Sequence, residues 1–194
     1  PRVSFKSARI ARRAAEDHQH RERKRKRLVV VFGLVLSYSW YYVCRLSLTY
    51  AAPAIVREEG LDLRRLGAIL SCGQISIGFS KILSSVLTAD LSPSRCLVVG
   101  LLLTAGCNVL ASLAPGGGGE GATQLVLILA GLWALNGLFQ GLGSPSCARI
   151  ISAWCSAKER GFFWSLWNVS NNLGGALAPL MVGLGAAAGW RGSL

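Results

Sequence analysis

The chain has 194 residues, of which 52% are hydrophobic and only 15% are charged. Soluble domains carry charge on roughly a quarter of their residues, so this composition excludes an ordinary soluble enzyme and favours a multi-pass membrane protein. The net charge of +12 is concentrated in residues 1–27, which hold 11 of the 21 Lys and Arg residues, so it argues only weakly for nucleic-acid binding.

Residues 1–27 form a polar, basic tail that ends in Arg-Glu-Arg-Lys-Arg-Lys-Arg at 21–27. Such a run also occurs in nuclear-localisation and nucleic-acid-binding segments, and a remnant of a transit peptide is a further alternative. An apolar stretch begins at Leu28, however, and basic residues beside a membrane span mark its cytoplasmic side and attract anionic lipids. We therefore expect a cytoplasmic tail that contacts anionic lipids of the bilayer, and no nucleic acid.

Five apolar stretches follow the tail, and each is long enough to cross a hydrocarbon core, which takes ~20 residues. They span about 28–56, 66–89, 96–114, 124–148 and 161–189. The sequence therefore predicts an all-α membrane protein with a transmembrane bundle over 28–194. Because the chain begins with Pro1 and stops at Leu194, we expect a fragment of a longer protein.

Patterns typical of catalytic or metal sites do not occur in the sequence. The six cysteines form no Cys-x-x-Cys pair and lie mostly in or beside apolar stretches, as small apolar helix residues do. Both histidines, His18 and His20, lie in the polar tail, and the glycines at 116–119 lack the Gly-Lys-Ser/Thr sequel of a phosphate-binding loop. We expect no enzyme activity, no catalytic residue, no metal and no cofactor.

Two basic residues stand where the membrane core is expected. Arg45 lies near the middle of the first stretch and Lys81 near the middle of the second, and a charged side chain at mid-membrane costs about 2.5–3.5 kcal/mol on insertion scales. None of the five stretches contains an Asp or Glu that would neutralise them. This mismatch predicts an anionic substrate, with Arg favouring phosphate or carboxylate through its planar fork and Lys supplying a point charge. In the alternative interpretation, the flexible Lys81 side chain extends to the inner interface.

Polar residues with helical spacing accompany these cations. Tyr38, Tyr42 and Arg45 share one helix face. Comparable stripes in the second, fourth and fifth stretches are Ser71, Gln74, Gly78, Lys81, Ser85 and Thr88; Asn136, Gln140, Gly143 and Cys147; and Trp164, Asn168, Asn171, Gly175 and Pro179. They predict either a polar cavity or amides that only join helices by hydrogen bonds. The third stretch has only Thr104, Asn108 and Ser112, and we expect it to be more peripheral.

The residue types missing from the apolar stretches also bear on mechanism. Proton-driven carriers commonly use intramembrane Asp, Glu or His as proton relays. The five stretches contain none of these. Exchange of one anion for another is therefore the simpler scheme.

The most specific pattern lies in the fifth stretch. There the chain closely resembles a signature of the organophosphate:phosphate antiporters of the major facilitator superfamily, which include glycerol-phosphate and hexose-phosphate transporters and the glucose-6-phosphate translocase. The residues are Arg160-Gly161, five more, then Trp167-Asn168-Val169-Ser170-Asn171-Asn172-Leu173-Gly174-Gly175. Similar pieces are Tyr41–Arg45, Gly78–Lys81, Leu135–Gly143 and Lys158–Gly161. The resemblance extends from about residue 30 to the end.

The resemblance implies a carrier of two six-helix halves. This chain would be the N-terminal half, with five full transmembrane helices and the start of a sixth, and without the C-terminal half. It also implies that Arg45 binds the substrate phosphate together with a basic residue of the other half, and that Lys81 lies near the translocation path. Tyr38, Tyr42 and Trp167 match positions that line the cavity.

Asn171 stands where the signature has a histidine that contacts phosphate in some members. An amide donates a hydrogen bond but cannot gain charge, so we expect no pH sensitivity from this position. By this resemblance we expect an integral multi-pass membrane protein that exchanges a sugar phosphate or glycerol phosphate for inorganic phosphate by alternating access. The alternatives are a sugar-phosphate sensor of the same fold that does not transport, and a carrier of another organic anion. The sequence leaves open whether the membrane is the endoplasmic reticulum, a plastid membrane or the plasma membrane.

Overall fold

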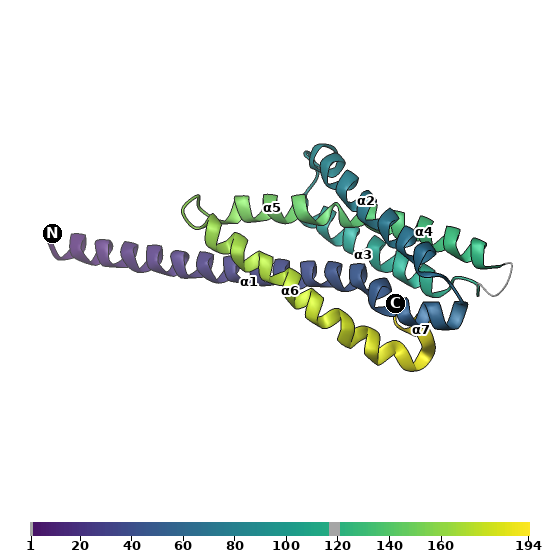
Figure 1. Cartoon of the computed structure of the whole chain (residues 1–194). Coiled ribbons are helices and arrows are strands. Elements are labelled where there is room, and N and C mark those ends of the chain that lie inside the picture. The colour runs from purple at the N-terminus through teal and green to yellow at the C-terminus, as the bar shows by residue number, and fades with distance from the viewer. Residues whose placement is uncertain (1, 117–120) are drawn as a thin grey trace.

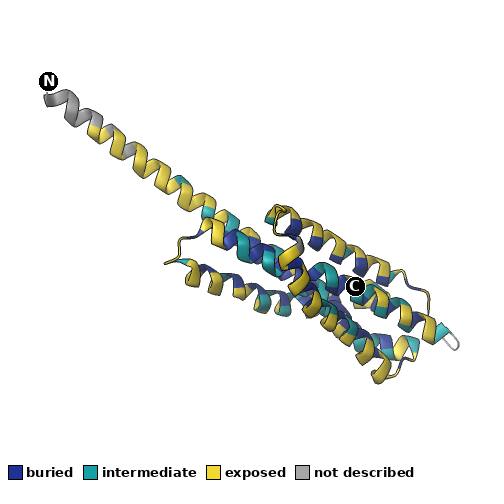
Figure 2. Cartoon of the chain, turned by 90° about the horizontal axis from the view of Figure 1, so that it is seen from above, coloured by how far each residue is buried: buried dark blue, intermediate teal, exposed yellow. Residues whose placement is uncertain are grey.

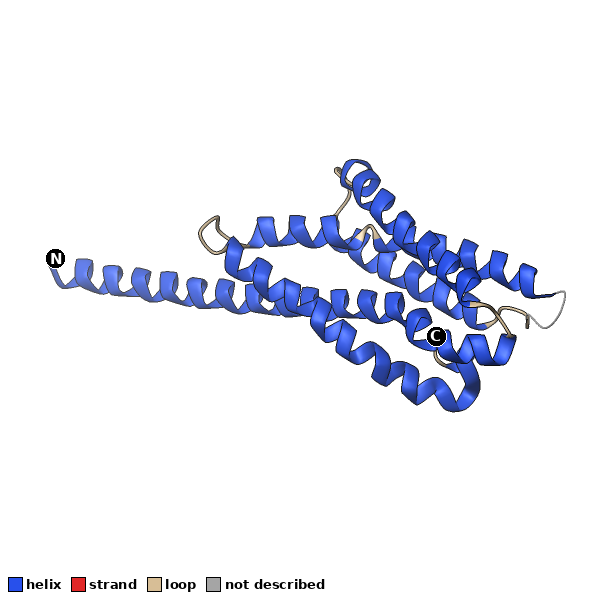
Figure 3. Cartoon of the chain, in the orientation of Figure 1, coloured by secondary structure: helices blue, strands red, loops and turns tan. Residues whose placement is uncertain are grey.

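The computed structural model describes residues 2–116 and 121–194, and throughout this described part the regular structure is helical, without strands (Figure 3). The elements are α1 (Arg2–Glu59), α2 (Leu63–Leu87), α3 (Pro93–Ser112), α4 (Gly121–Gln140), α5 (Gly143–Trp154), α6 (Arg160–Gly185), η1 (Ala186–Ala188) and α7 (Gly189–Gly192). Among the described residues, five helical segments are long and apolar enough to cross a membrane, with α4 and α5 together forming one of them. The expected all-α, multi-pass membrane class is thereby confirmed.

Helix α1 begins far before the first apolar stretch. It runs without interruption for 58 residues, a length of about 87 Å, and its first half projects beyond the other helices (Figure 1). After Pro1 the basic tail contains neither Gly nor Pro, and it is rich in Ala, Arg, Lys and Glu, which are good helix formers. The described tail residues are almost all exposed (Figure 2), so propensity and continuity with the spanning helix hold this segment helical.

The predicted helix over 124–148 is two helices with a turn at Gly141 and Leu142. A side chain at Gly141 would collide with Ser80 of α2, and one at Gly143 would press on the rings of Tyr38 and Tyr41. The glycines therefore allow close approach to two neighbours at the point where the helix bends. Pro145, which lacks a backbone N–H, follows in the first turn of α5, where prolines are tolerated.

Short connections with capping residues set the antiparallel order of the first helices. Asp62 caps α2 by accepting from the backbone N–H groups of Arg64 and Arg65, and Ser92 caps α3 by accepting from that of Arg95 at 3.2 Å. Such caps satisfy N–H groups that have no partner within the helix. Helix α1 packs against α6, α2 against α4, and α3 against α4 and α5.

The interior has two hydrophobic clusters separated by a polar layer. Along α1, Val31 to Tyr41 contribute to the cluster nearer the tail, and Leu48 to Ile55 to the cluster at the opposite end. Between them lie Cys44, Arg45 and Ser47. The polar residues of the middle layer are therefore enclosed above and below by packed apolar side chains.

At the end opposite the tail, α7 is tied to the last turn of α1. Trp190 is fully buried, and its Nε1 donates to Glu59 Oε1 at 2.8 Å. Arg191 Nη1 forms an ion pair with the same oxygen at 2.7 Å. These contacts fix the point at which the chain turns back after α6.

Candidate functional site

Arg45 lies in the polar layer, half-buried on α1. Its Nε donates to Gln140 Oε1 of α4 at 2.7 Å, and its guanidinium carbon lies 4.6 Å from the centroid of the Tyr42 ring. In the described part of the chain the ion pairs involve other basic residues, and none joins a carboxylate to Arg45. A neutral amide and an aromatic face therefore stabilise this charge without cancelling it.

Three buried amides, Gln140, Asn136 and Asn108, continue from Arg45 through the bundle, and we call them the amide chain. Gln140 Nε2 donates to Asn136 Oδ1 at 2.5 Å, and Asn136 Nδ2 donates to Asn108 Oδ1 at 2.8 Å. Asn108 Nδ2 then donates to the carbonyl of Cys44, next to Arg45 on α1, at 3.1 Å. All three side chains are at most 3% exposed. The amide chain links α4, α3 and α1 and orients the Gln140 oxygen towards the guanidinium.

Helix α3 is less peripheral than the sequence suggested. Thr104 and Asn108 are buried, and the Thr104 carbonyl accepts from Asn136 Nδ2 at 3.3 Å. Periodicity within one stretch does not reveal which helices are neighbours, so the Asn108 contact was missed. For Asn108 and Asn136, the interpretation that amides join helices by hydrogen bonds is correct.

Aromatic rings surround Arg45 where α1 packs on α6. The Tyr38 ring centroid lies 5.8 Å from that of Tyr42 and 4.9 Å from that of Trp167. Tyr38 and Trp167 are buried and Tyr42 is half-buried. Arg45, Tyr38, Tyr42 and Trp167 thus come together in one cluster, in which the rings are tilted against one another and the Tyr42 ring lies beside the cation.

Lys81 and Asn171 lie further from this cluster. No hydrogen bond in the described part of the chain joins either of them to Arg45. Lys81 is exposed on α2, and Asn171 is half-buried on α6, one turn beyond Trp167. Of the predicted stripes, those of α2 and α6 are mainly exposed, whereas that of α4 is buried.

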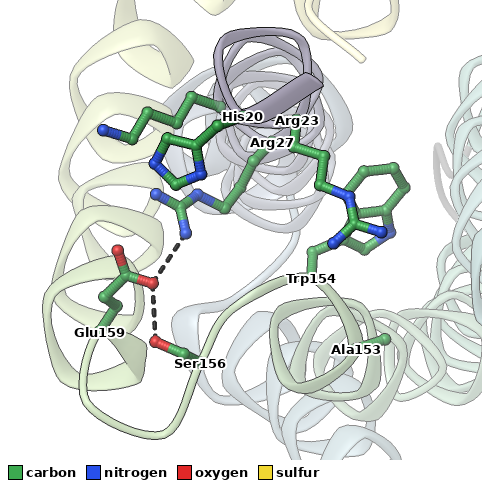
Figure 4. A pocket seen from close by; sticks show the side chains of 8 residues that line it. His20, Arg23, Arg27, Ala153, Trp154, Ser156 and Glu159 are labelled. Carbon is green, nitrogen blue, oxygen red and sulfur yellow. Dashed lines mark hydrogen bonds and ion pairs between the residues drawn. The ribbon is translucent and has the colours of Figure 1, made fainter. Parts of the chain in front are cut away.

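A polar hollow of about 760 Å³ lies between the tail half of α1 and the connection from α5 to α6 (Figure 4). Arg27 Nη1 and the Ser156 hydroxyl both donate to Glu159 Oε2 at 2.7 Å. Donation from Ser156, and then from Arg27, holds the pKa of Glu159 below its ordinary value. The Arg27 guanidinium also lies 4.8 Å from the centroid of the buried Phe163 ring. The sequence analysis did not predict the Arg27–Glu159 ion pair, whose members are 132 residues apart.

Known proteins similar to this chain include transporters of phosphate esters and a membrane sensor protein. A probable hexose phosphate transport protein of Chlamydia pneumoniae is 35% identical over 182 residues, which are 92% of this chain and 38% of that protein. The glycerol-3-phosphate transporter of Bacillus subtilis is 34% identical over 183 residues, 94% of this chain and 40% of that protein. The membrane sensor protein UhpC of Salmonella typhimurium is 35% identical over 176 residues, 90% of this chain and 37% of that protein.

The chain spans about two fifths of the length of these relatives. They are transporters and a sensor rather than enzymes, and their names agree with the resemblance to the organophosphate:phosphate antiporters. The model of the Major Facilitator Superfamily matches residues 24–194, from the last turns of the basic tail to the end of the chain. Since the match covers well over half of its residues, the chain belongs to the Major Facilitator Superfamily.

Proposed function

We propose that the full-length protein exchanges a sugar phosphate or glycerol phosphate for inorganic phosphate by alternating access. The observation that carries the proposal is Arg45, a cation in the interior whose hydrogen-bond partner is neutral. The structure records no hydrogen bond from its Nη groups within the described residues, so the fork is available to donate two bonds to a phosphate. The relatives named as hexose phosphate and glycerol-3-phosphate transporters support the substrate class.

The proposed roles of the surrounding residues follow from their chemistry. Arg45 binds the phosphate group, and Lys81 supplies a second positive charge from α2. The rings of Tyr42 and Trp167 offer flat surfaces to the organic part of the substrate. Asn171 donates an amide hydrogen bond. The proposed substrate-binding residues are therefore Arg45, Lys81, Tyr38, Tyr42, Trp167 and Asn171.

The lack of a carboxylate partner for Arg45 among the described residues supports exchange rather than one-way release. An empty site leaves the charge of Arg45 without a counter-ion in a medium of low dielectric constant, whereas a bound phosphate dianion supplies one. The carrier with a bound anion is then favoured over the empty carrier while the two halves rock, so one anion leaves as another enters.

A sensor that binds an organophosphate without carrying it is the second candidate. The observation that favours it is the similarity to UhpC of Salmonella typhimurium and of Escherichia coli, which are named as membrane sensor proteins and are 35% and 33% identical to this chain. A sensor needs the same cation in the interior, so Arg45 alone does not separate the two functions.

Proteoliposomes loaded with inorganic phosphate test the proposal. The reconstituted full-length protein should take up labelled phosphate and labelled hexose phosphate in exchange, and Arg45→Gln should abolish this uptake. Arg57→Gln is the matched control, because Arg57 lies on the same helix, is exposed and pairs only with its neighbour Glu58. Full uptake by Arg45→Gln would refute the proposal. Tight, Arg45-dependent binding without any exchange would identify a sensor.

A further inference from the structure

We infer that the hollow at the tail end of the bundle binds the phosphorylated headgroup of an anionic membrane lipid. This inference does not depend on what the central site carries. One wall of the hollow is a single face of α1, since its members are spaced by three or four residues. The residues that line it are His20, Arg23, Lys24 and Arg27 from α1, and Ala153, Trp154, Ser156 and Glu159 from the other wall.

The charge of this lining favours an anion. Its one acid, Glu159, already accepts hydrogen bonds from Arg27 and Ser156. Arg23 and Lys24 form no ion pair with any residue that the structure describes. Two positive charges therefore face a space of about 760 Å³, which lies within the usual range of sites for small organic ligands.

The level of the hollow along the bundle points to a lipid rather than a soluble anion. Arg27 is followed directly by the exposed Leu28, and the exposed Trp154 and Phe162 lie at the adjoining ends of α5 and α6. In a membrane, cations here meet the headgroup layer while these apolar side chains meet the acyl chains. Figure 4 shows Arg23 extending alongside the Trp154 ring, on the side of the hollow away from Glu159. Both parts of an anionic lipid thus have a complementary surface.

Paired variants separate a defined site from general attraction to a basic tail. The Arg23→Gln/Lys24→Gln variant removes the two unpaired charges of the hollow. The Arg21→Gln/Arg25→Gln variant removes the same charge from two residues that lie about 100–140° from His20 around the axis of α1. Binding of a short-chain phosphatidylinositol phosphate to the full-length protein in detergent is measured by titration. We expect the first variant to weaken binding about tenfold or more and the second less than about threefold. Equal weakening by both would overturn the inference, because diffuse attraction depends only on total charge.

Two further measurements test whether the ligand is negatively charged and whether it is a lipid or a soluble anion. Glu159→Gln removes the only acid that lines the hollow and releases Arg27, so lipid binding should become several-fold tighter; weaker binding by the folded variant would overturn the inference. Inorganic phosphate at millimolar concentration should fail to displace the lipid. Displacement by inorganic phosphate as effective as that by the lipid itself would assign the hollow to a soluble anion and refute the lipid.

Discussion

Replacing Gln140 with Glu tests whether the interior cation works because its partner is neutral. The change keeps the size of the side chain and puts a carboxylate where an amide oxygen now lies 2.7 Å from Arg45 Nε. Opposite unit charges about 4 Å apart attract by about 4 kcal/mol at the effective dielectric constant of a partly buried pair. Desolvation of the new carboxylate offsets part of this attraction, and losing the donation to Asn136 costs about 1–3 kcal/mol more.

The net effect should be competition between the new carboxylate and phosphate for the same guanidinium. We expect the KM for phosphate in homologous exchange to rise at least about tenfold, which corresponds to about 1.4 kcal/mol. Gln140→Met is the matched control, because it removes the hydrogen bond and leaves the Arg45 charge uncancelled. Its KM should rise less than that of Gln140→Glu. An unchanged KM in Gln140→Glu, with the protein folded, would show that the free charge of Arg45 does not bind the anion.

Three further changes probe other parts of the chain. Asn171→His should introduce pH dependence, with phosphate affinity rising relative to wild type as the pH falls through about 6.5; a constant ratio of KM values would place this side chain away from the anion. Trp190→Ala should lower the free energy of unfolding by about 3–5 kcal/mol, because the ring is fully buried and its Nε1 bonds to Glu59; thermal unfolding measures the loss. Because the folded-state pKa of Glu159 is lowered, the stability that Glu159 adds should be full above the ordinary Glu pKa and lost as pH falls through the lowered value. The difference in unfolding temperature between wild type and Glu159→Gln should then shrink on acidification.

Features confined to one helix were predictable from the sequence. The helical spacing of Tyr38, Tyr42 and Arg45 predicts a shared face, and the structure brings both rings and the cation together. The five apolar stretches likewise predict the candidate spans, because length and hydropathy decide whether a helix crosses a membrane.

Features that depend on the packing of helices were not predictable in this way. The bend between α4 and α5 reflects the close approach of Ser80 to Gly141, which a hydropathy pattern does not show. Asn108 contacts Asn136 only because α3 lies beside α4, and a stripe of polar residues on α3 alone gave no sign of this. The continuation of α1 to Arg2 was missed because the apolar pattern, rather than helix propensity, set the expected boundary.

The direction of the hydrogen bonds in the amide chain explains how a cation can be held in the interior and still attract an anion. Starting from Arg45, each amide accepts through its oxygen and donates through its nitrogen to the next acceptor, so the hydrogen bonds align head to tail and the Gln140 oxygen faces the guanidinium. Aligned dipoles lower the energy of the charge and fix the plane of the fork, as a carboxylate would, but they add no net charge. A carboxylate in the same place would stabilise the arginine more strongly and leave less of its charge for a ligand. A neutral partner is therefore what an anion-binding arginine requires at this depth, and Gln140 is the residue whose chemistry sets that balance.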